Sequence, residues 1–239
     1  MNRDKKQFLI AIAVGVIELV WFYIVSNFVY HNNMLISKDS ITWNNILIKI
    51  AVDYSVMLFI PTILLIINKK NLKDFNLCLE SQKEIFILII VMIAFFILHN
   101  DFTIRGFYKF FFYLVVVSFG EEFLFRGYVY NSLKIKSEVI AIILSGMLWG
   151  IAHAILPSIQ SNKDIIQMLF AMRNEVFGGI LSGWYFIYLQ EKSRTLWFPV
   201  LIHALLDYSF SFLGALVSVV AFIYLKMKSK KCKLNSISI

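Results

Sequence analysis

Charged residues, prolines and cysteines are scarce in this chain of 239 residues. Charged residues make up 16% of it and apolar residues 59%, whereas a soluble domain averages about 25% and 45–50%. That balance excludes an ordinary soluble fold. The two cysteines, Cys78 and Cys232, lie in segments that we expect to face the cytosol, so no disulfide is predicted. We expect an all-α, polytopic membrane protein whose residues 1–239 form a single transmembrane domain.

Long apolar runs take the place of the missing charges. They predict about eight transmembrane helices, at residues 7–30, 46–67, 84–98, 107–133, 137–156, 174–190, 196–208 and 211–225. The net charge is +8, but the basic residues lie in short loops and in the tail, which indicates topology signals facing anionic lipid rather than nucleic-acid binding. This pattern favours a multi-pass protein of the plasma membrane with both termini in the cytosol. The spacing Gly179-x-x-x-Gly183 predicts a closely packed neighbouring helix.

Three charged residues, Glu121, Glu122 and Arg126, interrupt the apolar run 107–133. A single charged side chain at a bilayer centre costs about 2.5–3.5 kcal/mol on insertion scales, so such residues are retained where they face a protein interior or a water-filled cavity. Glu122 and Arg126 share a helical face and are expected to pair. Glu121 points about 100° away and has no partner on its own helix. The alternative is a buried salt-bridge triad that only packs helices.

Polar residues of two later helices have similar predicted depths. His153 lies in the run 137–156, and His203 and Asp207 share one face of the run 196–208. At about 1.5 Å per residue, these residues and Glu121 all fall within the membrane. The set supports two chemistries. Glu121 could be the general base that activates a water molecule, or Glu121, His153, His203 and Asp207 could be ligands of a divalent metal ion. Glu18, in the first run, is expected to face the bundle, and the sequence assigns it no role.

Three motifs occur in order along the chain: Glu121-Glu122-x-x-x-Arg126, Trp149-x-x-x-His153, and Trp197-x-Pro199 followed by His203-x-x-x-Asp207. Together they resemble the CAAX protease and bacteriocin-processing family (CPBP, or Abi), whose members are eight-helix intramembrane endopeptidases. The resemblance covers about residues 107–208, the expected catalytic core. It implies that Glu121 and His153 activate the attacking water and that Glu122 and Arg126 hold the helix geometry. It also implies that His203 and the residue at position 207 stabilise the oxyanion.

Two positions depart from the family's common pattern. Trp149 stands where the second motif usually has Phe, which we interpret as a conservative aromatic exchange. Asp207 stands where the third motif often has Asn, and an ionised Asp cannot donate a hydrogen bond to an oxyanion. Asp207 must therefore be protonated, orient His203 or bind a metal ion. Zinc stays possible, but no histidine pair has the His-x-x-x-His spacing of a typical zinc helix, so a metal-free mechanism without a cofactor is favoured.

The resemblance implies hydrolysis of a peptide bond in a peptide or a membrane-associated protein. Eukaryotic relatives process prenylated tails, whereas bacterial relatives are linked to bacteriocin maturation, peptide pheromone signalling and self-immunity. A composition rich in Ile, Asn and Lys fits an AT-rich bacterial genome and argues against a prenylated substrate. Two alternatives stay open. One is a non-catalytic immunity or scaffold protein that binds a partner in the bilayer. The other is a transporter with Glu121 as a proton relay, against which the absence of inverted repeats weighs.

Overall fold

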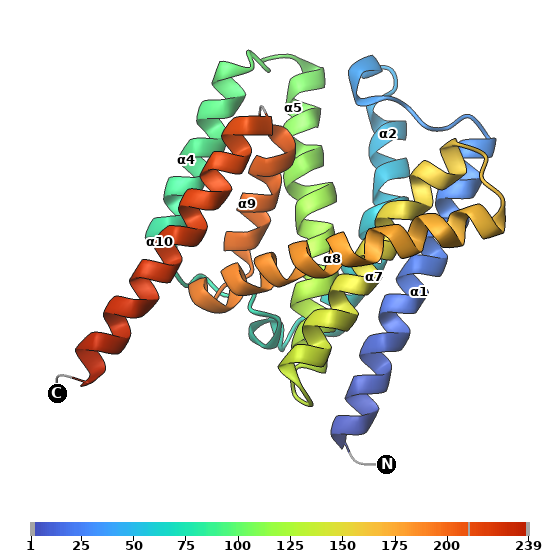
Figure 1. Ribbon diagram of the computed structural model, residues 1–239. Coiled ribbons are helices and arrows are strands. Elements are labelled where there is room, and N and C mark those ends of the chain that lie inside the picture. Colours follow the sequence, from blue (N-terminus) through green and yellow to red (C-terminus); the bar gives the residue numbers. More distant parts are fainter. Residues whose placement is uncertain (1–2, 210, 238–239) are drawn as a thin grey trace.

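The protein is all-helical in this computed structural model, which describes residues 3–209 and 211–237 (Figure 1). No strand occurs within these residues. Four helical segments are long and apolar enough to cross a membrane: Asp4–His31, Ile46–Ile67, Glu138–Gln160 and Phe212–Lys230. The all-α, polytopic fold expected from the sequence is therefore confirmed.

The described part of the chain forms eight continuous helical rods, each of which contains most of one of the eight apolar runs of the sequence. They are α1 (Arg3–His31); α2, η2 and α3 (Ile46–Asp53, Tyr54–Leu58, Phe59–Ile67); α4 (Gln82–Leu98); α5, η4, η5 and α6 (Ile104–Phe111, Phe112–Phe119, Glu122–Tyr130, Asn131–Leu133); α7 (Glu138–Gln160); α8 (Ile165–Ser193); α9 (Trp197–Tyr208); and α10 (Ser211–Ile237). Two short 3-10 turns, η1 (Lys38–Ser40) and η3 (Leu72–Phe75), lie in the connections.

The rod that carries the charged motif is π-helical over most of its length. Its segments η4 and η5 are both π-helices, and Glu121 lies between them. A π-helix bonds residue i to residue i+5, is rare in proteins, and occurs frequently at functional sites. Its wider turn changes the angles between successive side chains, so the α-helical geometry assumed from the sequence does not hold along this rod.

Several helix boundaries differ from those expected, among them the end of α10, which lies at Ile237 and not near residue 225. α8 begins at Ile165 and not near residue 174, because Asp164 caps it. The Asp164 carboxylate accepts a hydrogen bond of 2.8 Å from the backbone N–H of Gln167, whose side chain accepts one of 3.2 Å in return. α7 continues past Pro157 to Gln160. Proline removes one backbone hydrogen bond, but the carbonyl of Pro157 still accepts one of 3.1 Å from Ser161, which closes the last turn.

Glycines bring α7 and α8 together backbone to backbone. α8 runs across the bundle and crosses α7 (Figure 1). A Cβ atom added to Gly179 would lie 2.5 Å from the carbonyl oxygen of Gly146 and 2.6 Å from the Cα atom of Gly150. One added to Gly183 would lie 3.0 Å from the Cα atom of Gly146. The close approach predicted from the glycine spacing is therefore confirmed, and it holds α8 against the helix that carries Trp149 and His153.

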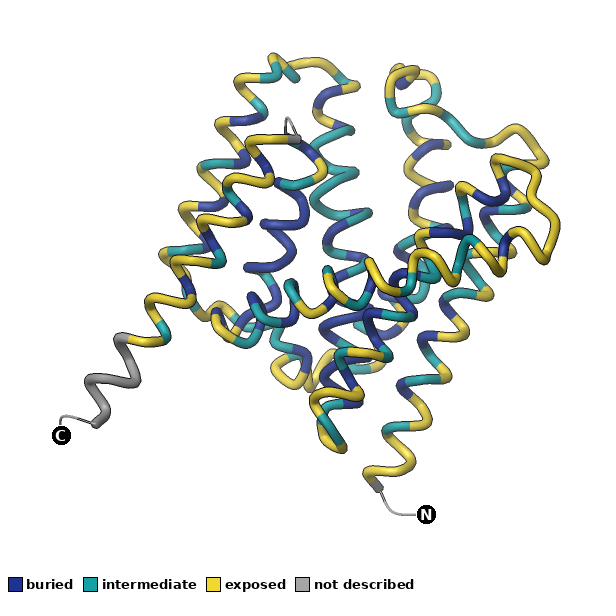
Figure 2. The backbone as a smooth tube through the Cα atoms, in the orientation of Figure 1, coloured by how far each residue is buried: buried dark blue, intermediate teal, exposed yellow. Residues whose placement is uncertain are grey.

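Helix α9 occupies the centre of the bundle. Every residue from Phe198 to Leu205 is buried, because α4, η4, α8 and α10 pack around the helix (Figure 2). Its 12 residues make it about 18 Å long, which is shorter than a bilayer core. The outer helices instead expose large apolar side chains, such as Ile17 of α1 and Phe86 of α4, which suit contact with lipid. The fold thus buries His203 and exposes large apolar side chains on its outer helices.

Candidate active site

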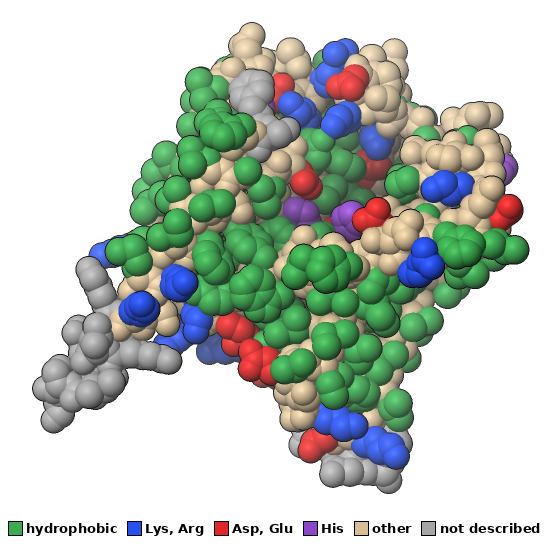
Figure 3. Space-filling model, in the orientation of Figure 1, with side chains coloured by type: hydrophobic (Ala, Val, Ile, Leu, Met, Phe, Trp, Pro, Cys, Tyr) green, Lys and Arg blue, Asp and Glu red, His purple; other side chains and the backbone are tan. Residues whose placement is uncertain are grey.

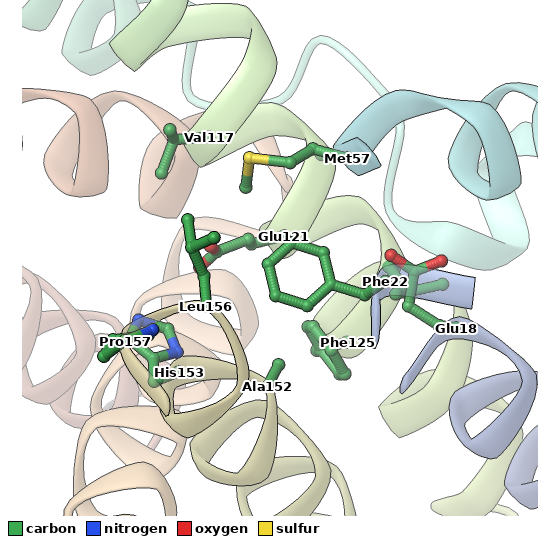
Figure 4. A pocket seen from close by; sticks show the side chains of 12 residues that line it. Glu18, Phe22, Met57, Val117, Glu121, Phe125, Ala152, His153, Leu156 and Pro157 are labelled. Carbon is green, nitrogen blue, oxygen red and sulfur yellow. The ribbon is translucent and has the colours of Figure 1, made fainter. Parts of the chain in front are cut away.

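Glu121 lines a cavity of about 220 Å³ between α1, the charged rod and α7 (Figure 4). The lining is mostly apolar, and its residues are Glu18, Phe22, Met57, Val117, Gly120, Glu121, Leu124, Phe125, Ala152, His153, Leu156 and Pro157. The face drawn in Figure 3 is hollowed near its centre, where histidine and acidic side chains gather. Two of the polar residues predicted from the sequence, Glu121 and His153, therefore face open space inside the bundle.

The Glu121 carboxylate has a partner on another helix. The indole Nε1–H of Trp149, on α7, donates a hydrogen bond of 2.5 Å to Oε2 of Glu121. The Glu121 side chain is 16% exposed, so the hydrogen bond holds a carboxylate that solvent can still reach. Trp149 is not a conservative exchange for Phe at this position, because Phe has no N–H to donate. The sequence interpretation of Trp149 is corrected on this point.

His203 is held between carboxylates. Its Nδ1 atom lies 2.9 Å from Oε1 of Glu122, at hydrogen-bond distance. Its Nε2 atom lies 4.0 Å from Oε2 of Glu121 and 3.5 Å from Oδ2 of Asp207. The ring also stacks on Phe186 of α8, with ring centroids 4.9 Å apart. The Glu122 carboxylate therefore places a proton on Nδ1 and orients Nε2 toward Glu121 and Asp207.

Glu122 and Arg126 form the expected pair. Arg126 Nη1 lies 3.4 Å from Glu122 Oε1, and the two side chains are 1% and 0% exposed. The guanidinium group stacks on two aromatic rings, with its Cζ atom 4.3 Å from the centroid of Trp149 and 5.3 Å from that of Phe186. Glu122 Oε1 thus faces Arg126 on one side and His203 on the other, a link to His203 that the α-helical reading of the sequence did not reveal.

His153 lines the same cavity as Glu121, but its imidazole is at hydrogen-bond distance from a backbone carbonyl of its own helix. Its Nδ1 atom is 3.0 Å from the carbonyl oxygen of Trp149, and its ring meets the Trp149 ring edge to face at 4.3 Å between centroids. The side chain is exposed. With Nδ1 engaged by the backbone, Nε2 is the ring atom available to a water molecule or a substrate. The structure places His153 beside Glu121 without a direct hydrogen bond between them.

Asp207 lies in the last turn of α9, where the helix is partly exposed. Its side chain is 34% exposed, and its 3.5 Å separation from His203 Nε2 is longer than a strong hydrogen bond. The next residue, Tyr208, is buried, and its hydroxyl group donates a hydrogen bond of 2.7 Å to Asp101 in the α4–α5 connection. That anchor fixes the end of α9 and therefore the position of Asp207.

The residues proposed as metal ligands do not form a metal site as they are placed. Among the described residues, no group of three or more His, Cys, Asp and Glu side chains is arranged to hold a metal ion. Of the four candidate ligands, Asp207 and Glu121 lie 3.5 and 4.0 Å from His203 Nε2, whereas His153 Nδ1 lies 3.0 Å from the backbone carbonyl oxygen of Trp149.

Two contributors to the site were not predicted as site residues from the sequence. Phe186 packs on both Arg126 and His203, yet it is one of 23 phenylalanines in an apolar chain. Glu18 was assigned no role, yet it lines the cavity with Glu121. Its expected orientation toward the bundle is confirmed, because its side chain is buried.

Part of the chain matches the model of a known protein family. The family model described as Rce1-like, type II CAAX prenyl endopeptidase, matches residues 102–209. This segment runs from the α4–α5 connection to the end of α9 and contains all three motifs, from Glu121 to Asp207. Neither a curated protein nor a solved structure matched the chain.

Proposed function

From residues 102–209, which carry the pattern of the CAAX protease family, we propose that this protein is an intramembrane endopeptidase whose attacking water is activated by Glu121. The family match supports a CAAX-protease-like endopeptidase in general. The proposal goes further and assigns roles to individual side chains. Glu121 and His203 sit at the reacting centre, and Trp149 and Glu122 position them.

One observation carries the proposal. Glu121 Oε2 and His203 Nε2 face each other at 4.0 Å, and each is held from behind by a residue of another helix. Trp149 of α7 holds the carboxylate, and Glu122 of η5 holds the imidazole. A general base and a hydrogen-bond donor that are held close together, with the base lining a cavity, are the groups that hydrolysis of a carbonyl compound requires.

In the proposed reaction, Glu121 takes a proton from water while the water oxygen bonds to the peptide carbonyl carbon. The carbonyl π electrons move onto the oxygen, and the resulting oxyanion accepts a hydrogen bond from Nε2 of His203. An imidazolium ring can donate from Nε2 to the oxyanion and from Nδ1 to Glu122 at the same time. The intermediate then collapses, the C–N bond breaks, and the proton on Glu121 passes to the leaving nitrogen. His153, on the same cavity, assists in placing the water.

We propose a peptide or a membrane-associated protein segment as the substrate, in bacteriocin or pheromone processing or in self-immunity. The protein would lie in the plasma membrane with both termini in the cytosol. The start of α1 and the end of α10 lie at the same end of the molecule, the lower end in Figure 1, which supports termini on one side. A reporter fused to the C-terminus should be active only in the cytosol, and a periplasmic or extracellular reporter signal would contradict this topology.

The test is cleavage of a panel of quenched fluorescent peptides by the purified protein in lipid nanodiscs, with and without a chelator. Wild type is expected to cleave at least one peptide, and the chelator is expected to leave the rate within about threefold, a change of less than 1 kcal/mol in the barrier. Glu121→Gln supplies the inactive control. Binding of a peptide without cleavage under all conditions would favour the non-catalytic immunity or scaffold alternative.

A further inference from the structure

A buried carboxyl group outside the family match lines the cavity. Glu18 of α1 is 6% exposed, and its Oε2 atom is buried without a hydrogen-bond partner among the described residues. The adjacent Ile17 is 54% exposed, so α1 turns its apolar side chains outward and this acid inward. An ionisable group kept inside a membrane helix without a partner is costly, which suggests that it has a function.

Three other interior carboxylates of the described chain have partners. Oδ1 of Asp53 lies 2.6 Å from Nζ of Lys49. Oε1 of Glu122 lies 3.4 Å from Nη1 of Arg126. Oε2 of Glu121 accepts a hydrogen bond of 2.5 Å from the indole N–H of Trp149. Among the described residues that line the cavity with Glu18 there is no Lys or Arg. The described lining of the cavity therefore holds two carboxyl groups and neither Lys nor Arg to pair with Glu18.

The shape of the cavity suits a long side chain with a cationic end. In Figure 4 the carboxyl groups of Glu18 and Glu121 lie on opposite sides of the Phe22 ring. Met57 and Leu156 contribute further apolar walls. Methylene stems of Lys and Arg pack on apolar surface while their charged ends reach polar groups, and an aromatic face attracts a cation.

We propose that this cavity is a specificity subsite for a basic residue of the substrate, with Glu18 as the carboxylate that pairs with its cationic end. The inference rests on the proposed function and narrows it to peptides that carry Lys or Arg beside the cleaved bond. The stem would lie along Phe22, and the ammonium or guanidinium group would supply the hydrogen bond that Glu18 lacks. The shared cavity with Glu121 places the basic residue next to the scissile bond.

The experiment uses the full-length protein in nanodiscs and sets of peptides. Within a set, the peptides differ at one position, which is Lys, norleucine or Glu, and this position is moved along the peptide from set to set. Norleucine keeps the stem of Lys and removes its charge. Wild type is expected to cleave the best Lys peptide with a kcat/KM about 10- to 100-fold above that of its norleucine counterpart, which is the range of a charge-assisted hydrogen bond. In Glu18→Gln this ratio should fall to near one. Glu138→Gln, at an exposed acid in the first turn of α7, is the matched control and should keep the ratio.

Gln buries no charge, so Glu18→Gln is expected to accumulate as well as wild type. Glu18→Asp provides a second variant that keeps the charge on a shorter stem, and it should keep a reduced preference for Lys. Cleavage without a preference for Lys, or with a preference that Glu18→Gln retains, would overturn the subsite and leave the protease function standing.

Binding of the same peptides, labelled and followed by fluorescence anisotropy, separates the two proposals. Binding that is selective for Lys and that disappears in Glu18→Gln, without any cleavage, would support the subsite and refute the protease function. Absence of both binding and cleavage for every peptide would overturn both.

Discussion

Arg126→Ala is predicted to lower the free energy of unfolding by about 3–5 kcal/mol and to reduce the amount of protein in the membrane. The Glu122 and Arg126 side chains are 0% and 1% exposed, and their charged atoms lie 3.4 Å apart. Removing the guanidinium group leaves the Glu122 charge buried without its cation. A loss of this size is a large fraction of the stability of a folded domain, which is about 5–15 kcal/mol.

Two neighbouring contacts change that magnitude in opposite directions. The guanidinium group also stacks on Trp149 and Phe186, and a desolvated cation–π contact contributes about 2 kcal/mol, which adds to the loss. His203 Nδ1 lies 2.9 Å from Glu122 Oε1 and is still present when Arg126 is replaced. Its interaction with the Glu122 carboxylate offsets part of the loss. The expected loss therefore stays within the range for a broken buried pair.

A double variant separates charge from packing. Glu122→Gln with Arg126→Met replaces both charged groups by neutral side chains of similar size, an exchange that is often neutral or stabilising for a buried pair. Gln at position 122 keeps an oxygen that can accept from His203 Nδ1. We expect most of the lost abundance to return. Lys134→Ala is the matched control, because Lys134 pairs with Glu191 at 2.8 Å with both side chains about one-third exposed. Such a pair contributes only about 0–1 kcal/mol.

The assay compares membrane abundance by immunoblot with the midpoint of thermal unfolding in detergent. Arg126→Ala should fall below wild type in both measurements, and the double variant should lie between them. Equal abundance and equal midpoints for the three proteins would refute the argument that this pair is a buried structural element. A double variant less stable than Arg126→Ala would refute the assignment of the loss to the unpaired charge.

Four further variants, at three positions, probe the candidate site. Glu121→Gln should lower kcat/KM about 10²-fold or more with normal abundance, since Gln cannot take a proton, and full activity would remove Glu121 as the base. Trp149→Phe keeps the ring against Arg126 but removes the donor to Glu121, so kcat/KM should fall about 10- to 100-fold in the peptide assay. Asp207→Asn should retain most activity and Asp207→Ala should lose it, because Asn can donate to an oxyanion. A dead Asn variant with bound zinc in wild type, measured by metal analysis, would contradict that role.

The helices and one buried ion pair could be predicted from the long apolar runs and from the charged residues within them. Eight runs gave the eight rods, and the charges at Glu122 and Arg126 indicated a pair that the structure contains. These features are readable because burial of charge and exposure of apolar surface have large free-energy costs. The start of α8 was also readable, since Asp164 and Gln167 have the spacing of a capping box, but the surrounding polar residues indicated a loop.

The hydrogen bonds and ion pairs between helices at the site were not predictable. An α-helical geometry separates Glu121 from Glu122, whereas the rod is π-helical on both sides of Glu121, and both carboxylates approach His203. Nothing in a single sequence distinguishes a π-helix from an α-helix of the same composition. The hydrogen bond from Trp149 depends on where α7 lies relative to the rod, which the glycine contacts with α8 help to set. Contacts of this kind depend on tertiary packing and not on local sequence pattern.

Glu122 joins the stability of the bundle to the geometry of the site. One oxygen, Oε1, faces Arg126 at 3.4 Å and His203 at 2.9 Å. The resemblance assigned Glu122 to helix geometry and His203 to the oxyanion, as separate tasks. Because the same oxygen serves both, a change that moves Glu122 must also move the imidazole that would face the oxyanion. Activity lost in Arg126 variants therefore measures the displacement of His203 as well as unfolding. Only the rate per folded molecule, compared between Arg126→Ala and the double variant, separates these two effects.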